Sequence, residues 1–292
     1  IIDGLLQALE HHDHIRTMYL VGDEETIRAS LGQAGHLAPR IEVVHSPEVL
    51  SMEEKPVVGL RRKKKCSLAM ATDLVKHGQA DAVLSAGNTG GMVAAASIKL
   101  RTLPGVDRPA LAAMLPTLGD NDAIMLDLGA NTECDARNLV QFAVMGAAYA
   151  RIALDIDRPR VRLLNIGTEE LKGTDEIRDA AAILRAANDL SLQFDGFTEG
   201  DKIARGDSDV IVCDGFSGNV ALKTAEGTAR FVTDVLRKAF TSSIRSKIGF
   251  LISKPAMYML KHRPRRPQNR SQMRFPDPCG HKAGETSSFP TN

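Results

Sequence analysis

Four segments of the chain combine glycine with small polar residues, and each follows a short apolar run. They are residues 85–91 (SAGNTGG), 127–133 (DLGANTE), 165–173 (NIGTEELKG) and 214–219 (DGFSGN). Glycine lets a backbone approach a ligand closely, and the first turn of a following helix presents unpaired N–H groups that suit phosphate. A single loop of this kind is about as often a simple turn as a ligand-binding loop. Four of them together favour an anion-binding site.

The polar groups of these loops could stabilise a phosphate group or an oxyanion. The backbone N–H groups of residues 87–91 are donors, and the amides of Asn131 and Asn219 add donors without negative charge. Asp127 and Asp214 either orient these donors, accept a proton, or only cap the loops, and Glu133 and Glu169 are weaker candidates for that task. The candidate catalytic residues are Asn88, Thr89, Asp127, Asn131, Asp214 and Asn219, and the candidate binding residues are Gly87, Gly90, Gly91, Arg62, Lys63, Lys64, Lys172 and Lys223.

Short β-like runs alternate with helical patterns along the chain. The runs are residues 17–22 (TMYLVG), 41–46 (IEVVHS), 80–85 (ADAVLS), 110–116 (ALAAMLP), 123–129 (AIMLDLG), 161–167 (VRLLNIG) and 209–215 (DVIVCDG). This alternation predicts the α/β class, with a mainly parallel, Rossmann-like layered sheet covered on both faces. Ligands bind such sheets along the carboxyl edge of the strands. The four loops are therefore predicted to share that edge.

The composition excludes several function classes. A net charge of +1 over 292 residues gives no global attraction to nucleic acid, and the chain has neither a GxGxxG nor a Walker A loop. The four cysteines lack the spacing of metal ligands, and the histidines lie outside the four loops, so no histidine-assisted nucleophile is expected. Residues 139–154 are apolar but too polar and too short to span a bilayer. We expect a cytoplasmic protein with no cofactor and no metal.

Two segments are locally basic. Residues 61–65 (RRKKK) form either a solvated face or a docking strip for an acidic partner or phosphate. Residues 235–261 contain six lysines and arginines and no acidic residue, beside apolar residues at helical spacing, and Gly249 and Pro255 predict the break of a helical hairpin. Such a basic amphipathic segment fits a dimer interface or a membrane surface, and we favour reversible membrane contact.

Several long motifs carry a resemblance to a known family. RRKKKCSLAMATDLVKHGQADAVLSAGNTGG, LDLGANTE, NIGTEELKGTDEIRDA and DGFSGNVALKTAEG closely resemble the bacterial phosphate acyltransferases of phospholipid synthesis, over about residues 1–261. The resemblance implies transfer of a fatty acyl group from acyl carrier protein to inorganic phosphate. It also implies a homodimer, a fold similar to phosphate acetyltransferases and isocitrate dehydrogenases, and a membrane glycerol-3-phosphate acyltransferase that uses the product.

The resemblance also sets expectations for the ends of the chain. Family members begin with a strand and a loop like DAMGGD, so residues 1–262 are expected to form the α/β catalytic domain without that strand and loop. Residues 263–292 are rich in proline and arginine and are expected to be a disordered tail outside the family pattern. Cys66 stands where the family more usually has serine.

The chemistry needs few residues, because a thioester is already activated and phosphate attacks it without a covalent enzyme intermediate. Lys172 and Lys223 could neutralise the attacking phosphate, although lysines on helices are more often solvated. Two alternatives stay open at this stage. One is an acyl-coenzyme A donor in place of the carrier protein, and the other is an inactive, truncated homologue that binds the carrier protein or a membrane.

Overall fold

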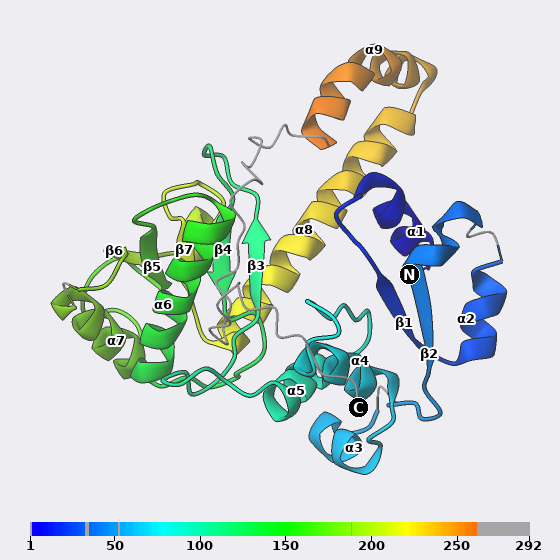
Figure 1. Cartoon of the computed structure of the whole chain (residues 1–292). Coiled ribbons are helices and arrows are strands. Elements are labelled where there is room, and N and C mark those ends of the chain that lie inside the picture. The colour runs from blue at the N-terminus through cyan, green and yellow to red at the C-terminus, as the bar shows by residue number, and fades with distance from the viewer. Residues whose placement is uncertain (1, 33–34, 52, 188, 262–292) are drawn as a thin grey trace. The chain divides into compact units, whose positions relative to one another are not determined.

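The computed structural model describes residues 2–32, 35–51, 53–187 and 189–261 (Figure 1). Two compact units are built from separate stretches of the chain. Of the described residues, the first contains those within 2–111, Asp127–Gln141 and Asp214–Asn219, and the second contains Ala112–Leu126 and those within 142–213 and 220–261. The prediction of one catalytic domain over residues 1–262 stays a prediction, and the predicted tail at residues 263–292 lies outside the described residues.

The second unit is built on a five-stranded sheet with the order β3-β4-β7-β5-β6. Its strands are β3 (Ala112–Leu115), β4 (Ala123–Leu126), β5 (Arg160–Leu164), β6 (Gln193–Thr198) and β7 (Val210–Val212). The β4, β7, β5 and β6 strands are parallel, and β3 pairs antiparallel with β4 at one edge. Every residue of β4 and β7 is buried. The predicted mainly parallel α/β sheet is confirmed, although β6 was not among the predicted strands.

Two helices of this unit pack closely on the sheet. Helix α6 (Ala136–Ala153) approaches it at Gly146, where an added Cβ would lie 2.5 Å from Val210 and 2.7 Å from Leu126. Helix α7 (Asp175–Ala186) buries Ala180, Ala181 and Leu184 and places the Arg185 guanidinium over the rings of Phe194 and Phe197 on β6. Small residues on the helices therefore allow the close helix-to-sheet packing.

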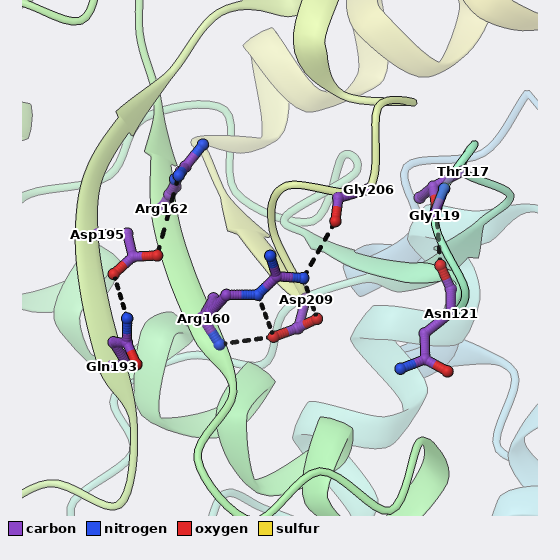
Figure 2. Close-up of polar contacts among 9 residues, drawn as sticks. All are labelled: Thr117, Gly119, Asn121, Arg160, Arg162, Gln193, Asp195, Gly206 and Asp209. Carbon is purple, nitrogen blue, oxygen red and sulfur yellow. Dashed lines mark hydrogen bonds and ion pairs between the residues drawn. The ribbon is translucent and has the colours of Figure 1, made fainter.

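An ion pair joins the beginnings of β5 and β7, at the edge opposite to the strand-end loops (Figure 2). The Asp209 carboxylate is 8% exposed and accepts from the backbone N–H of Arg160 at 2.8 Å and from its guanidinium at 2.9 and 3.0 Å. The guanidinium also donates to the carbonyl of Gly206 at 3.0 Å. These hydrogen bonds raise the pKa of Arg160. A carboxylate this buried is tolerated because it is paired and hydrogen-bonded.

The same edge contains a close contact between two backbone segments. An added Cβ on Gly206, whose φ is 90°, would lie 2.6 Å from the backbone of Gly119. The Thr117 hydroxyl accepts from the N–H of Gly119 at 3.0 Å and donates to the carbonyl of Asn121 at 2.7 Å, as Figure 2 shows. Position 206 therefore fits only glycine unless the backbone at Gly119 moves.

The first unit contains a parallel pair of strands, β1 (Met18–Gly22) and β2 (Ile41–His45). Its helices are α1 (Ile2–His11), α2 (Glu24–Ser30), α3 (Pro56–Arg62), α4 (Ser67–Lys76) and α5 (Thr89–Lys99), with a 3-10 turn at Gly35–Arg40. Leu60, Cys66, Ala69 and Ala95 form a small buried cluster between α3, α4 and α5. The α4 and α5 helices are also joined by an ion pair of Lys99 with Asp73 at 2.7 Å.

The prediction of a strand at residues 80–85 was wrong. The structure gives these residues no strand conformation, and Leu84 is 95% exposed. Among the described residues of this unit, β1 and β2 pair only with each other, so this apolar run has no neighbouring strand to complete a hydrogen-bond ladder.

The predicted helical hairpin is present, but its break lies elsewhere. Helix α8 (Gly215–Thr241) is followed by α9 (Ile244–Lys261), and both Gly249 and Pro255 lie inside α9. The break falls at residues 242–243 because the Ser243 hydroxyl caps α9, accepting from the N–H of Ser246 at 3.1 Å. The rings of Phe240 and Phe250 lie 5.1 Å apart and fold the two helices back on each other.

Two fully buried threonines, one in each unit, differ in whether the hydroxyl group has a hydrogen-bond partner. Thr72 donates its hydroxyl to the carbonyl of Leu68 at 2.7 Å, whereas the hydroxyl of Thr198 is buried without a partner. Thr198→Val should raise the free energy of unfolding by about 1 kcal/mol, because an unsatisfied buried hydroxyl is costly. Thr72→Val should lower it by about 1 kcal/mol.

Urea denaturation of both variants and the unaltered chain measures these changes. Equal destabilisation by the two substitutions would contradict the assignment, since it would mean that the Thr198 hydroxyl has a partner, such as a bound water.

Candidate active site

Two of the four glycine-rich loops meet within the first unit. The N–H of Gly215 donates to the carbonyl of Asn131 at 2.7 Å, and an added Cβ on Gly215 would lie 2.6 Å from that carbonyl. Gly129 has a φ of 130° and lies against Asn219, whose Cβ is 3.7 Å from the position of an added Cβ. The loops at residues 127–133 and 214–219 therefore form one structure, as the sequence predicted for neighbouring strand ends.

Asp127 organises these loops. Its carboxylate is 0% exposed. One oxygen accepts from the N–H groups of Leu111, Gly129 and Ala130 at 2.9, 3.2 and 3.0 Å, and the other accepts from the N–H and the side-chain amide of Asn131 at 2.7 and 2.8 Å. Of the three predicted roles, these contacts fit orienting or capping the loops, and proton acceptance stays a prediction.

The side chain of Asn131 also forms its hydrogen bonds within the protein. Its amide nitrogen donates to Asp127 and to the carbonyl of Pro109, both at 2.8 Å, so both of its N–H bonds have acceptors. A direct donor role toward an oxyanion stays a prediction and requires one of these bonds to break.

Asp214 caps the beginning of α8. Its carboxylate accepts from the N–H of Ser217 at 2.8 Å, and its carbonyl accepts from the N–H of Gly218 at 2.9 Å. Asn219 lies exposed in the first turn of the same helix. The Asn219 amide is therefore open to a ligand, in contrast to that of Asn131.

Residues 85–91 form the N-terminal cap of α5. Asn88 accepts through its side-chain oxygen from the N–H of Gly91 at 3.0 Å, and the Ser85 hydroxyl accepts from the N–H of Gly87 at 3.1 Å. These two N–H groups, predicted as phosphate donors, are used within the loop. The N–H groups of Thr89 and Gly90 begin the helix, where no earlier carbonyl of the helix can pair with them. The Asn88 amide nitrogen and the Thr89 hydroxyl are the further donors there.

The fourth loop, residues 165–173, belongs to the second unit. It carries Lys172, whose side chain is exposed and lies with that of Glu169 over Gly167. Lys223, the other candidate lysine, forms an exposed ion pair with Glu226 at 2.9 Å on α8. This contact fits a solvated helix surface and leaves the phosphate role of Lys223 as a prediction.

One residue of the basic strip at residues 61–65, Lys63, forms hydrogen bonds with the segment before α3. Lys63 donates to the Glu54 carboxylate and to the carbonyl of Val49, both at 2.8 Å, and its hydrogen bond lowers the pKa of Glu54. Arg62 and Lys64 are exposed. The strip therefore offers Arg62 and Lys64 to a partner, while Lys63 holds the preceding loop on α3.

Cys134 lies next to the framework carboxylates but is not an activated nucleophile. Burial, followed by the negative charge of Asp127, raises the pKa of its thiol to about 11. A nucleophilic cysteine needs the opposite environment, one that lowers its pKa. Among the described residues, no group of three His, Cys, Asp or Glu side chains is arranged to hold a metal ion.

Comparison with known proteins decides the family. Residues 1–268 match the family described as "Fatty acid synthesis protein". Over 262 residues the chain is 58% identical to a phosphate acyltransferase of Erythrobacter litoralis, an alignment that covers 90% of this chain and 74% of the relative. A phosphate acyltransferase of Granulibacter bethesdensis is 47% identical, with 89% and 70% covered. The chain belongs to the phosphate acyltransferase family. The predictions of the family and of an acyltransferase enzyme are confirmed.

Solved structures support the fold. EutD phosphotransacetylase from Staphylococcus aureus gives a TM-score of 0.51 at 22% identity and covers 73% of this chain and 74% of that one. A phosphotransacetylase from Streptococcus pyogenes gives a TM-score of 0.51 at 20% identity, with 74% and 85% covered. The predicted similarity to phosphate acetyltransferases holds at the level of the fold.

One positioning residue was missing from the predicted site. Asn165, 8% exposed, bridges the two ends of the loop at residues 165–173, accepting from the N–H of Ile166 and donating to the carbonyl of Lys172. The signal for it was an asparagine at a strand end, followed by Gly173 at a φ of 90°. Sequence alone shows the two residues but not the bridge between them.

The raised pKa of Cys134 can be measured by alkylation. Because only the thiolate reacts, iodoacetamide should modify folded Cys134 slowly at about pH 8, and the rate should rise about tenfold per pH unit until the pH approaches 11. The same cysteine in the urea-denatured chain, with a pKa of about 8.5, is the reference. Mass spectrometry of the Cys134 peptide gives both rates, and equal rates at about pH 8 would contradict a raised pKa.

Proposed function

We propose that this chain transfers a fatty acyl group from acyl carrier protein to inorganic phosphate and so forms acyl phosphate for phospholipid synthesis. The start of α5 carries the proposal: the N–H groups of Thr89 and Gly90 lie in its first turn, and the Thr89 hydroxyl and the Asn88 amide nitrogen belong to the same residues or their neighbour. A helix start of this kind suits a phosphate or a developing oxyanion. Family membership supplies the acyl-transfer chemistry.

These donors support the attack of phosphate on a thioester. A phosphate oxygen attacks the thioester carbonyl, the carbonyl oxygen gains negative charge in the tetrahedral state, and the carbon–sulfur bond then breaks. The carrier leaves as a thiol after taking up a proton, and the acyl group stays on phosphate. The neutral donors of Asn88 and Thr89 stabilise charge that is present most fully in the tetrahedral state. Asp127 and Asp214 hold the loops of the first unit, and the phosphate role of Lys172, which belongs to the second unit, stays a prediction.

The exposed part of the basic strip is proposed to dock the carrier protein. Acyl carrier protein is acidic, and complementary charge at the rim of an interface raises the rate of association. Arg62 and Lys64 are exposed for this role, whereas Lys63 is committed to Glu54. An acyl-coenzyme A donor remains the alternative substrate, and a non-catalytic protein that binds the carrier protein or a membrane remains the alternative class.

The helical hairpin is proposed to contact a membrane surface reversibly. Ile244, Ile248, Leu251 and Ile252 are 78, 55, 68 and 76% exposed, and basic residues such as Arg245 and Lys247 lie among them. No helix within the described residues is both long and apolar enough to cross a bilayer. This surface suits a cytoplasmic protein that passes a lipid-like product to a membrane glycerol-3-phosphate acyltransferase. A homodimer is also proposed, and its interface is the competing use of these apolar side chains.

Activity assays test the main proposal. Asn88→Ala and Thr89→Val should each lower the rate of acyl phosphate formation by about tenfold or more, as expected for the loss of one donor to an oxyanion. Thr233→Val, at an exposed threonine of α8 that is outside the candidate site, is the matched control and should keep most of the activity.

The unaltered chain decides between the alternatives. If acyl phosphate forms faster from acyl-coenzyme A than from acyl carrier protein, then acyl-coenzyme A is the acyl donor. No acyl phosphate from either donor would favour the non-catalytic binder, and normal kinetics in both the Asn88 and Thr89 variants would remove the site assignment.

Vesicle sedimentation tests the membrane surface. Ile248→Glu should release the chain from anionic vesicles at any salt concentration, whereas salt alone should weaken binding of the unaltered chain only partly. Ile183→Glu, at an apolar residue of α7 that is 47% exposed, is the control and should leave binding unchanged. If Ile248→Glu instead dissociates a dimer or unfolds the chain, the apolar face is an interface or a core.

A further inference from the structure

Helix α3 carries a shallow recess on the surface of the first unit. The recess is lined by Glu54, Lys55, Val58, Gly59 and Arg62, which belong to α3 or directly precede it. Val58 is 50% exposed, and Lys55 and Arg62 are exposed beside it. This surface therefore combines an apolar side chain with two cations on one short stretch of the chain.

Contacts within the first unit hold the segment before α3 against the helix. The Glu54 carboxylate accepts from the Lys63 ammonium at 2.8 Å and from the N–H of Ser51 at 3.1 Å. The two also pack closely at Gly59, where an added Cβ would lie 2.3 Å from Leu50. A partner would therefore meet a surface that is already formed, which lowers the ordering that binding requires.

Cations outnumber carboxylates around the recess. Residues 48–65 contain six lysines and arginines and three glutamates. The Glu54 carboxylate pairs with Lys63, and that of Glu48 accepts from the N–H of Lys65 at 2.7 Å. The exposed charged residues of the segment are one carboxylate, Glu53, and five cations, Lys55, Arg61, Arg62, Lys64 and Lys65. With all carboxylates counted, the surface is complementary to an acidic partner.

The recess adjoins the donors at the start of α5, and both belong to the first unit. An added Cβ on Gly90, in the first turn of α5, would lie 3.7 Å from the ring of Pro56, in the first turn of α3. Helix α5 contains no acidic residue. Lys55 directly precedes Pro56, so a partner seated on α3 lies beside the place where its thioester would react.

We propose that this recess docks acyl carrier protein, with Val58 as the apolar contact and Lys55 and Arg62 as the charged rim. This inference rests on the proposed acyl transfer and adds the apolar contact that the basic strip lacks. Charge at a rim speeds the association of an acidic partner, whereas an apolar contact made after docking slows its dissociation. Coenzyme A has no protein surface to fill the recess, so the recess favours the carrier protein as donor.

Stopped-flow binding of unacylated acyl carrier protein tests the proposal without turnover. Arg62→Glu and Lys55→Glu should each lower the association rate constant about tenfold at low salt, and the loss should largely disappear at about 1 M salt. Val58→Ser should raise the dissociation rate constant about fivefold, as expected for covering the exposed half of a valine, and should change association by about twofold or less.

Two exposed residues of the same unit serve as matched controls. Arg16→Glu repeats the charge reversal outside residues 48–65, and Ile98→Ser repeats the apolar loss at a residue of α5 that is 45% exposed. Neither substitution should change either rate constant by more than about twofold.

Other results would overturn the proposal. Normal rate constants in the recess variants, changes equal to those of the controls, or no binding of the carrier protein by the unaltered chain would mean that it docks elsewhere or not at all. If the variants lose binding to anionic vesicles and not to the carrier protein, the recess is a membrane surface. A lower urea midpoint in both Val58→Ser and Val58→Ala would mean that Val58 packs within the protein. Acyl phosphate formation is measured separately: its absence rejects the proposed function, while the rate constants still decide the docking surface.

Discussion

The buried carboxylate of Asp127 is the interaction on which the two meeting loops of the first unit depend. It satisfies backbone N–H groups from residues 111 and 129–131 together with the Asn131 amide, and Asn131 in turn accepts from Gly215. Without a charged acceptor at this point, these donors would be buried and unpaired, at a cost of about 1–3 kcal/mol each. One side chain therefore sets the shape of two loops that lie far apart in the sequence.

Charged and neutral side chains have different roles in this arrangement. The aspartates serve the protein framework, with Asp127 under the loops, Asp214 at the start of α8 and Asp209 paired with Arg160. The groups open to a ligand at the start of α5 are uncharged donors. A negative charge placed among such donors would repel an anion, so the proposed phosphate role of these donors requires uncharged groups there.

The sequence predicted the layered α/β class, because apolar runs report burial. It also predicted one shared edge for all four loops, of which residues 127–133 and 214–219 are seen to meet. It failed where partners far along the chain decide. Residues 80–85 have the composition of a strand but no neighbouring strand, and β6 was missed because the register shift at its pairing with β5 and Gly196, at a φ of 79°, break the alternation. The hairpin break followed a serine cap and not Gly249 or Pro255. The inward use of the Asn131 amide depends on Pro109, whose proximity no local pattern encodes.

The contact between Gly119 and Gly206 has a consequence for how this family can change during evolution. A methyl group on either residue would meet the backbone of the other, at 3.1 Å from position 119 and at 2.6 Å from position 206. Position 206 cannot accept a side chain unless the opposite loop changes its path, whereas a methyl group at position 119 needs a shift of only a few tenths of an ångström. The β3–β4 connection and the segment before β7 should therefore diverge together, with insertions in one accompanied by insertions in the other. Three strands, β4, β5 and β6, lie between these two segments in the chain.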